Sequence, residues 1–379
     1  MEKSTTHLMI VAGEASGDMH AAHLVDQIKA LDPSITFSGV GGRAMEKNGV
    51  ELYSHLADLA VVGFTEVFRH LGEIRAVFRL ILDKVDETKA QAVILVDFPG
   101  FNLRLAKELK KRGVKVFYYI SPQVWAWKEN RVKLIKEYVD EMFVLFPFEE
   151  EFYRKHDYPV HFVGHPLLDM IKPKMSREHL LSSLGLSCDK LTIGIFPGSR
   201  KIEIERLLPI MLDTARILSQ ENKNVQFLLS RAPTITKEFM EKHIRLTDLP
   251  LKIFDQPGYD GLNACDVCMV TSGTATLETA ILEKPMVVVY KTSFLTYLLA
   301  RLFIKIPYIG LVNVVAGKKI VPECIQFEAT PKNISTHLKE IFTNEIKSAE
   351  THSELQKLKN LLGEPGASHR AARKILELI

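Results

Sequence analysis

Short apolar runs alternate with helix-patterned segments along almost the whole chain, and this alternation restricts the fold more than any other feature. In the first half the runs lie at residues 8–12, 37–40, 92–96, 116–120, 142–146 and 161–163. In the second half they lie at residues 191–196, 225–229, 251–254, 267–270 and 286–290. Strands that are this uniformly apolar are buried on both faces, which is typical of a parallel sheet covered by helices. The sequence therefore predicts a doubly wound α/β fold.

The alternation is interrupted once, so we expect two domains. A chain of 379 residues exceeds what one hydrophobic core ordinarily supports. The interruption begins at a Gly-His-Pro turn and continues through a polar stretch to Cys188. We predict two Rossmann-like domains that face a central cleft, with the last helix returning to the first domain. The expected boundaries are a first domain over 1–168, a linker over 169–189, a second domain over 190–345 and a helical segment over 346–379.

The bulk composition excludes several classes of protein. A net charge of +3 is too small to indicate a nucleic-acid partner. No apolar stretch reaches the roughly 18 residues that a membrane-spanning helix requires, and the N-terminus lacks the apolar core of a signal peptide. Cys265 and Cys268 have the spacing of half a zinc site, but no second pair exists, which favours core packing. We therefore expect a cytoplasmic protein that is at most peripheral on a membrane.

Each half opens with an apolar run, a turn of small polar residues and a helix pattern, as the first βα unit of a doubly wound domain does. The first turn, at residues 13–18, is acidic because it contains Glu14 and Asp18. The second turn, at residues 197–200, contains Arg200. We expect a phosphate to bind the backbone N–H groups and the guanidinium of the second turn and to avoid the first. The alternative for the second turn is an ordinary βα turn with a surface arginine.

Asp97 directly follows the apolar run at 92–96 and is the candidate general base. A carboxylate at the carboxyl end of a strand faces the ligand side of an open sheet. Partial burial, with few local cations, would raise its pKa into the range of a useful base. The alternative is a turn-forming or capping aspartate, although Asn102 already offers a cap for a helix beginning at residue 103.

The segment Ser-Gly-Thr-Ala-Thr-Leu-Glu at 272–278 follows another strand and opens a helix. A glycine there lets a ligand approach the backbone, and the helix N-terminus presents N–H groups to an anion. Glu278, about one turn into the helix, is placed to accept hydrogen bonds from ribose hydroxyls. The alternative is a carboxylate that caps the helix.

Both tryptophans of the chain, Trp125 and Trp127, follow one strand within the segment 121–127. They either stack on a sugar or an acyl chain or pack in the core. His20 and His165 could form hydrogen bonds with a substrate, but the sequence favours a structural role for both.

Two amphipathic segments indicate a ligand with apolar chains. Phe64 and Phe68 belong to an apolar helical face that continues to residue 82, and a second such face runs over 294–306. Basic residues lie beside both faces, which favours contact with a membrane interface. Burial in the core explains either segment alone.

In its motifs the chain resembles the lipid-A-disaccharide synthases, which are glycosyltransferases of the GT-B class. The motifs stand in order over most of the sequence: 13–18, Asp97 with 98–102, 121–127, 146–149 (Phe-Pro-Phe-Glu), 164–167, 197–200, 272–278, 312–313, 321–323 and Gln326. Phe196, Val312 and 314–316 depart from the expected residues, but none of these changes removes a polar group that the chemistry needs.

The resemblance implies an inverting hexosyltransferase of lipid A and lipopolysaccharide biosynthesis in Gram-negative bacteria. The donor would be UDP-2,3-diacylglucosamine and the acceptor 2,3-diacylglucosamine 1-phosphate, joined by a β-1,6 bond with release of UDP. The resemblance implies no cofactor and no metal, and peripheral contact with the cytoplasmic face of the inner membrane. A homodimer remains open. Other GT-B enzymes, UDP-sugar 2-epimerases and non-catalytic UDP-sugar or lipid-binding proteins are the competing interpretations.

The resemblance also assigns roles to residues. Asp97 matches the general base of the family, on the side of the acceptor. The expected UDP and donor site comprises Ser199, Arg200, Ser272, Gly273, Thr274, Ala275, Glu278, Asn313, Glu323 and Gln326. The candidates on the acceptor or acyl side are Glu14, Ser16, His20, Trp125, Trp127, Phe64 and Phe68. Arg43, Lys128 and Arg131 are candidates for binding the acceptor phosphate, and nothing in the sequence selects among them.

Overall fold

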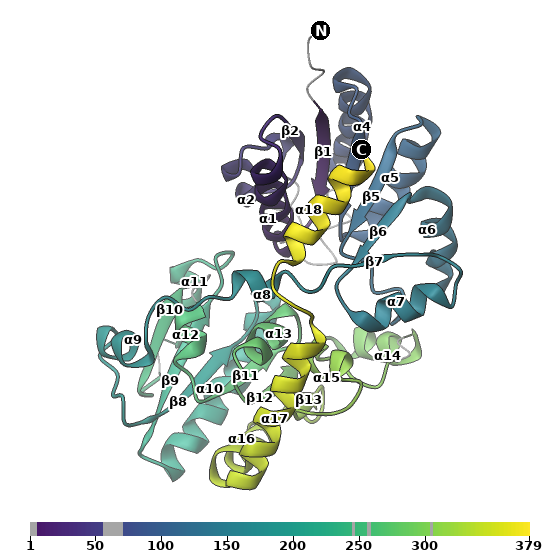
Figure 1. The fold of residues 1–379 in the computed structure, drawn as a ribbon. Helices are drawn as coiled ribbons and strands as arrows, with labels where there is room; N and C mark the ends of the chain where they lie inside the picture. The colour runs from purple at the N-terminus through teal and green to yellow at the C-terminus, as the bar shows by residue number, and fades with distance from the viewer. Residues whose placement is uncertain (1–5, 56–70, 245–246, 256–258, 304–305) are drawn as a thin grey trace. The chain divides into compact units, whose positions relative to one another are not determined.

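The computed structural model describes residues 6–379 except 56–70, 245–246, 256–258 and 304–305. The chain forms two compact units (Figure 1). Unit 1 comprises Met1–Leu168 together with Leu362–Ile379, and unit 2 comprises Asp169–Leu361. The expectation of two parallel-sheet α/β domains with a helical C-terminus is confirmed.

Unit 1 contains a sheet in the order β3-β2-β1-β4-β5-β6-β7, and every pairing among the described residues is parallel. The strand order reverses between β1 and β4, which is where open α/β sheets bind ligands beyond the carboxyl ends of the strands. The strands are β1 (His7–Ala12), β2 (Thr36–Val40), β3 (Glu51–Ser54), β4 (Ala92–Val96), β5 (Lys115–Tyr119), β6 (Glu141–Val144) and β7 (His161–Phe162).

The apolar faces of amphipathic helices cover this sheet and bury it, which accounts for the apolar composition of β4 and of β1 after His7. The helices of unit 1 are α1 (Ala15–Leu31), α2 (Arg43–Lys47), α4 (Leu71–Thr88), α5 (Pro99–Lys111), η1 (Glu129–Arg131), α6 (Val132–Tyr138), α7 (Pro147–Arg154) and α18 (Ala367–Leu378), while α8 (Leu167–Met170) crosses into unit 2.

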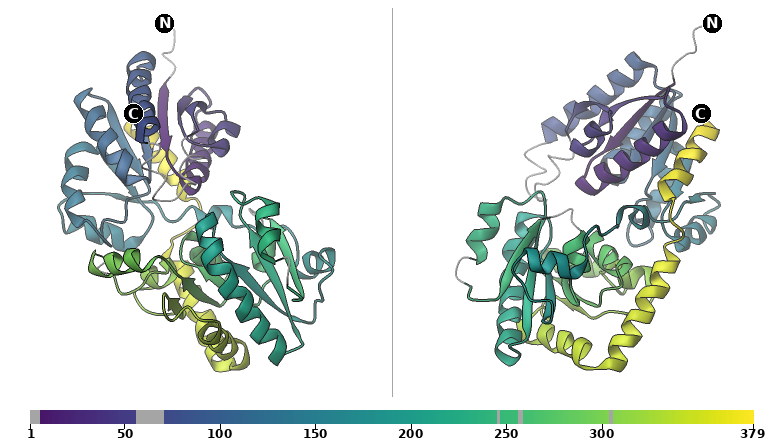
Figure 2. Two further views of the ribbon diagram at one scale, coloured as in Figure 1. Left: turned by 180° about the vertical axis from the view of Figure 1, so that it is seen from behind. Right: turned by 60° about the vertical axis from the view of Figure 1, so that its left-hand side comes forward.

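The C-terminal helix α18 completes unit 1 and lies beside α1 (Figures 1 and 2). The Ser368 hydroxyl lies 2.9 Å from Nδ1 of His23 on α1 and 3.3 Å from the Tyr119 hydroxyl at the end of β5. The Arg370 guanidinium donates hydrogen bonds of 2.9 and 2.7 Å to the carbonyl of Val163, just after β7. The segment 346–379, expected to be helical, is divided between α17 in unit 2 and α18 in unit 1.

Unit 2 repeats the architecture with a parallel sheet in the order β10-β9-β8-β11-β12-β13, whose order reverses between β8 and β11. The strands are β8 (Leu191–Phe196), β9 (Val225–Arg231), β10 (Leu251–Asp255), β11 (Val267–Thr271), β12 (Met286–Tyr290) and β13 (Glu323–Ile325). The helices are α9 (Arg177–Ser183), α10 (Lys201–Glu221), α11 (Lys237–Ile244), α12 (Tyr259–Asn263), α13 (Thr274–Ile281), α14 (Phe294–Phe303), α15 (Leu311–Ala316), α16 (Pro331–Thr343) and α17 (Glu345–Leu361).

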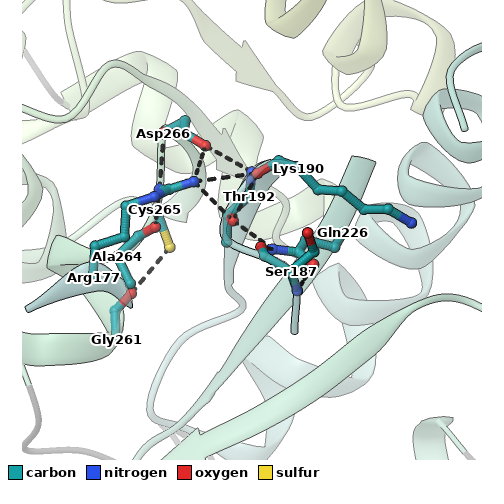
Figure 3. Close-up of polar contacts among 9 residues, drawn as sticks. All are labelled: Arg177, Ser187, Lys190, Thr192, Gln226, Gly261, Ala264, Cys265 and Asp266. Carbon is teal, nitrogen blue, oxygen red and sulfur yellow. Dashed lines mark hydrogen bonds and ion pairs between the residues drawn. The ribbon is translucent and has the colours of Figure 1, made fainter. Parts of the chain in front are cut away.

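The segment 169–189, expected as a linker, belongs to unit 2 and is fixed to the amino-terminal edge of its sheet. Figure 3 shows Arg177 of α9 paired with Asp266, just before β11, at 2.9 Å. The same carboxylate accepts a 2.7 Å hydrogen bond from the backbone N–H of Thr192 in β8. Nε2 of Gln226 donates to the Thr192 hydroxyl at 3.0 Å. This network lies at the edge opposite to the turns that follow β8 and β11, so we interpret it as structural.

Cys265 and Cys268 are both fully buried and unpaired, which confirms core packing. Among the helices that the structure describes, none is both long enough and apolar enough to cross a bilayer.

Candidate active site

Asp97 lies in a strained turn where unit 1 reverses its strand order. Both Asp97 and Phe98 have positive φ angles, 47° and 48°, which non-glycine residues adopt only when their surroundings hold them there. Here the carbonyl oxygen of Asp97 accepts hydrogen bonds from the Tyr118 hydroxyl at 2.6 Å and from Nδ2 of Asn102 at 2.8 Å. The Asp97 N–H donates a 3.2 Å hydrogen bond to the backbone carbonyl of Tyr119. The neighbouring strand β5 thus fixes the position of the candidate base.

The expectation that Asn102 caps the following helix is wrong. Helix α5 begins at Pro99, four residues earlier than expected, because proline at the first helical position has the required φ and no N–H to satisfy. Asn102 consequently lies within the first turn, and its amide holds the carbonyls of Val96 and Asp97.

The two turns at this edge of the sheet pack directly on one another. Phe98 lies over Gly13, so closely that a Cβ atom at residue 13 would be 2.2 Å from Cδ1 of the ring. A side chain at residue 13 would therefore require the Phe98 ring to move, and glycine avoids this.

This packing makes the Asp97 carboxyl a weaker acid than that of an ordinary aspartate. The pKa of its carboxyl rises from an ordinary value of 3.8 to about 7, first because burial disfavours the charged form and second because Glu14 is a nearby negative charge. A hydrogen bond from the Phe98 N–H acts in the opposite direction. The expected rise in pKa is confirmed. Near neutral pH the group is poised to accept a proton.

Other residues of the first turn have different surroundings. Glu14 and Ser16 are partly exposed at the start of α1. The carboxylate of Asp18 accepts backbone hydrogen bonds from Gly42, Ala44 and Met45 at 2.8–3.1 Å, so it joins α1 to α2 and is structural.

His20 is buried in α1, and its ring meets the His165 ring edge-on at 6.2 Å between centroids. Burial, and secondarily the charge of His23, lowers the pKa of His20 to about 4. Burial, and secondarily His20, lowers the pKa of His165 to about 3. Both imidazoles are therefore neutral at physiological pH and serve as hydrogen-bonding or packing groups.

The loop after β5 carries both tryptophans with opposite exposures. Trp125 is half-buried, donates a 3.1 Å hydrogen bond to Glu149 and meets the Phe148 ring edge-on at 4.9 Å. Trp127 is 41% exposed. Phe64 and Phe68, expected on the acyl side, lie outside the described residues.

Glu149 has no predicted role from the sequence, although it belongs to the motif Phe-Pro-Phe-Glu at 146–149. The carboxyl is buried, and it accepts hydrogen bonds from the N–H groups of Leu145 and Phe146 at 3.1 Å as well as from Trp125. Burial raises its pKa to about 7, although these hydrogen bonds act to lower it. The available signal was a Glu three residues after Phe146, the residue that precedes α7, which is capping-box spacing.

In unit 2, the turn at 197–200 is the first of two that border the point of strand reversal. Two of its backbone N–H groups are already bound, since those of Ser199 and Arg200 donate to one carboxylate oxygen of Glu203 at 3.0 and 3.2 Å. The Arg200 guanidinium contacts the other oxygen at 3.2 Å and is 52% exposed. The expectation that these amides hold a phosphate therefore does not match the structure. An anion at this turn would meet the Arg200 side chain.

The second turn, at 272–276, follows the adjacent strand β11. Ser272 donates from its hydroxyl to the carbonyl of Ile309 at 2.7 Å. Gly273 has φ of 154°, and a Cβ there would meet nothing within 4 Å, so the backbone is open on that side. Thr274 and Ala275 are the first two residues of helix α13. Burial raises the pKa of Glu278 to about 7. This turn keeps the features expected of a donor site.

Three further residues expected at the donor site are buried and bonded to protein groups. Glu323 accepts from the N–H groups of Ile309 and Gly310 at 3.1 and 3.0 Å and from the Asn313 amide at 2.9 Å. Asn313 Oδ1 in turn accepts from two N–H groups near residue 320. Gln326 exchanges two hydrogen bonds of 3.1 Å with the backbone of residue 292. These side chains shape the loops beside β12 and β13.

Comparison with known proteins places these observations in a family. The chain matches the family model described as lipid-A-disaccharide synthetase over residues 8–376. It is 46% identical over 373 residues to the lipid-A-disaccharide synthase of Syntrophus aciditrophicus strain SB, covering 98% of this chain and 97% of that protein.

Solved structures agree on the fold. The glycotransferase of kitacinnamycin matches with a TM-score of 0.69 at 13% identity, covering 99% of this chain and 100% of that one. The UDP-GlcNAc 2-epimerase of Neisseria meningitidis, solved with UDP-GlcNAc bound, matches with a TM-score of 0.68 at 12% identity, covering 98% and 100%. At these identities the likeness concerns the fold alone.

Proposed function

The chain belongs to the lipid-A-disaccharide synthase family, glycosyltransferases of lipid A biosynthesis, and from this we propose its reaction and the residues that carry it. It transfers 2,3-diacylglucosamine from UDP to the 6-hydroxyl of 2,3-diacylglucosamine 1-phosphate. The anomeric centre is inverted, and the products are the β-1,6-linked disaccharide 1-phosphate and UDP. The observation that carries the proposal is Asp97, held at the point of strand reversal with a pKa of about 7.

In the proposed mechanism Asp97 is the general base. The acceptor 6-hydroxyl must lose a proton as its oxygen attacks the anomeric carbon, and the Asp97 carboxylate takes that proton. A base is most effective when its pKa lies near the working pH, because it is then substantially ionised and still basic. A single displacement with one base gives inversion, and Asp97 is the residue of unit 1 that combines the position with the pKa.

The leaving group is assigned to unit 2. UDP departs as the anomeric C–O bond breaks, and negative charge develops on the diphosphate. The half-exposed Arg200 guanidinium and the N–H groups at the start of α13 stabilise that charge. Glu278 is assigned to the ribose hydroxyls. Asn313, Glu323 and Gln326 support this site indirectly, through the loops that they hold.

We also propose peripheral contact with the cytoplasmic face of the inner membrane. Phe294, Leu298 and Leu302 lie at intervals of four along α14 and are 63%, 46% and 71% exposed. Phe327, 69% exposed, lies 6.4 Å from Phe294 between ring centroids. Large apolar side chains gathered on a surface favour an apolar partner such as the lipid substrates' acyl chains or the bilayer that holds them. A homodimer stays a prediction.

The test is a mass-spectrometric assay for the tetraacyl disaccharide phosphate. Purified protein is mixed with UDP-2,3-diacylglucosamine and 2,3-diacylglucosamine 1-phosphate, with EDTA present, and Asp97→Asn is assayed in parallel. We expect product from the native protein and loss of turnover in the variant with UDP affinity retained. If UDP affinity collapsed together with the rate, Asp97 would be structural. Absence of product from the native protein, or activity on unacylated UDP-sugar alone, would refute the proposed reaction.

A further inference from the structure

The loop that joins β5 to η1 and α6 emerges beside the candidate base. In the sheet of unit 1, β5 is the immediate neighbour of β4, and Val96 is in register with Tyr119. The residue after Val96 is Asp97, so the chain that follows Tyr119 leaves the sheet next to the Asp97 turn. Arg43, in contrast, follows β2, which is separated from β4 by β1.

The inner side of this loop is fixed by buried groups. Ser121 shares a 2.8 Å hydrogen bond with the buried Tyr153 hydroxyl, and Trp125 donates to the buried Glu149. Two non-glycine residues of the loop, Ile120 and Lys128, have positive φ angles of 70° and 58°. Strain of this kind persists where the surroundings determine the conformation, and it is often found at ligand sites.

The outer side of the loop brings two cations to one exposed ring. Nζ of Lys128 lies 4.4 Å and Cζ of Arg131 lies 5.5 Å from the centroid of the Trp127 ring. Within the described residues, neither cation forms an ion pair with a carboxylate. Glu129, between them in sequence, is 3.4 Å from His156. Two like charges on one indole repel each other, and an anion placed against both would remove that repulsion.

Electrostatics connects this cluster to the base. Burial raises the pKa of Tyr118 well above its ordinary value, and the charge of Asp97 raises it further. The positive charge of Arg131 lowers it. Arg131 therefore lies near enough to influence a hydroxyl that itself donates to the Asp97 carbonyl at 2.6 Å.

We propose that Trp127, Lys128 and Arg131 bind the phosphate monoester of the lipid acceptor. This inference rests on the proposed function and deepens it. The acceptor sugar has its reacting 6-hydroxyl and its 1-phosphate on the same ring, so a phosphate site beside the base holds the hydroxyl near Asp97. A monoester carries a charge of about −1.5 to −2 at pH 7, which matches two cations. The planar guanidinium binds two of its oxygens, and the ammonium binds as a point charge.

The experiment compares two acceptors that differ only in the 1-phosphate. The value of kcat/KM is measured in detergent micelles with 2,3-diacylglucosamine 1-phosphate and with the dephosphorylated sugar, and their ratio is taken. For the double variant Lys128→Gln/Arg131→Gln we expect this ratio to fall by about 10–100-fold, which is the usual loss when charge-assisted hydrogen bonds to a ligand are removed. Lys133→Gln, an exposed lysine of α6 outside the ring contacts, and Arg43→Gln should leave the ratio as in the native enzyme.

The outcomes separate the possible failures. If the native protein makes no disaccharide, the proposed function itself fails. If it makes disaccharide and the double variant keeps the native ratio, the acceptor-phosphate site is refuted. Co-sedimentation with phosphatidylglycerol vesicles tests the other source of the same chemistry. Weaker sedimentation of the double variant with an unchanged ratio would assign the cluster to bilayer headgroups and overturn its assignment to the acceptor. Circular dichroism of all variants checks folding.

Discussion

The pH dependence of turnover offers the sharpest test of the assigned base. Only the ionised form of Asp97 accepts a proton, and its pKa of about 7 lies well above the ordinary 3.8. The ionised fraction is then about one-tenth at pH 6, half at pH 7 and nine-tenths at pH 8. The rate should therefore rise by roughly tenfold between pH 6 and pH 8. An ordinary aspartate would already be ionised throughout that range.

The assay measures kcat/KM for disaccharide formation from pH 5 to 9. Two other carboxyls, Glu149 and Glu278, also have pKa values raised to about 7 by burial, and the acceptor phosphate titrates near pH 6. The decisive comparison is with Asp97→Asn, whose residual rate should lose the rise between pH 6 and 8. Glu278→Gln should retain that rise at a lower overall rate. A native profile that is flat above pH 5, or a rise that persists in Asp97→Asn, would refute the assignment.

Three further predictions concern single side chains. Arg200→Ala should lower turnover by about 10²–10³-fold, the usual effect of removing one charge-stabilising donor, and an unchanged rate in a steady-state assay would remove it from the mechanism. Gly13→Ala should cost about 1–3 kcal/mol of unfolding free energy in urea, because the added methyl overlaps Phe98. Gly100→Ala, whose methyl meets nothing within 4 Å, is its control, and equal midpoints would contradict the argument. Arg177→Ala should reduce the unfolding free energy by about 1–2 kcal/mol, and an unshifted urea midpoint would show that the network of Figure 3 contributes little.

The elements that the sequence predicted well are those set by local pattern. The apolar composition of 92–96 and 191–196 requires burial on both faces, so the parallel sheets follow from the sequence. The place of Asp97 after a buried strand was enough to predict its raised pKa, because burial is the larger cause. The return of α18 to unit 1 was expected as well, although its partners on α1 are more than 300 residues away in sequence.

The features that the sequence did not predict depend on side-chain rotamers and on the order of strands in the sheet. Glu203 stands three residues after Arg200, which is capping-box spacing, but that spacing alone does not show that the carboxylate takes the amides of both Ser199 and Arg200. The selection of Lys128 and Arg131 over Arg43 required the strand order, which places β5 and not β2 beside β4. Neither a rotamer nor a strand order is fixed by local periodicity.

The division of unit 1 between the two ends of the chain has a consequence for its synthesis. Residues 1–168 leave the ribosome before unit 2, but α18, which covers α1 and holds the end of β7 through Arg370, is synthesised after unit 2. At about 5–20 residues per second, roughly 10–40 s pass between the two events. Unit 2 is continuous in sequence and needs no such wait. The half of the protein that is translated first is therefore the half that finishes folding last, and until then the face of α1 has no cover.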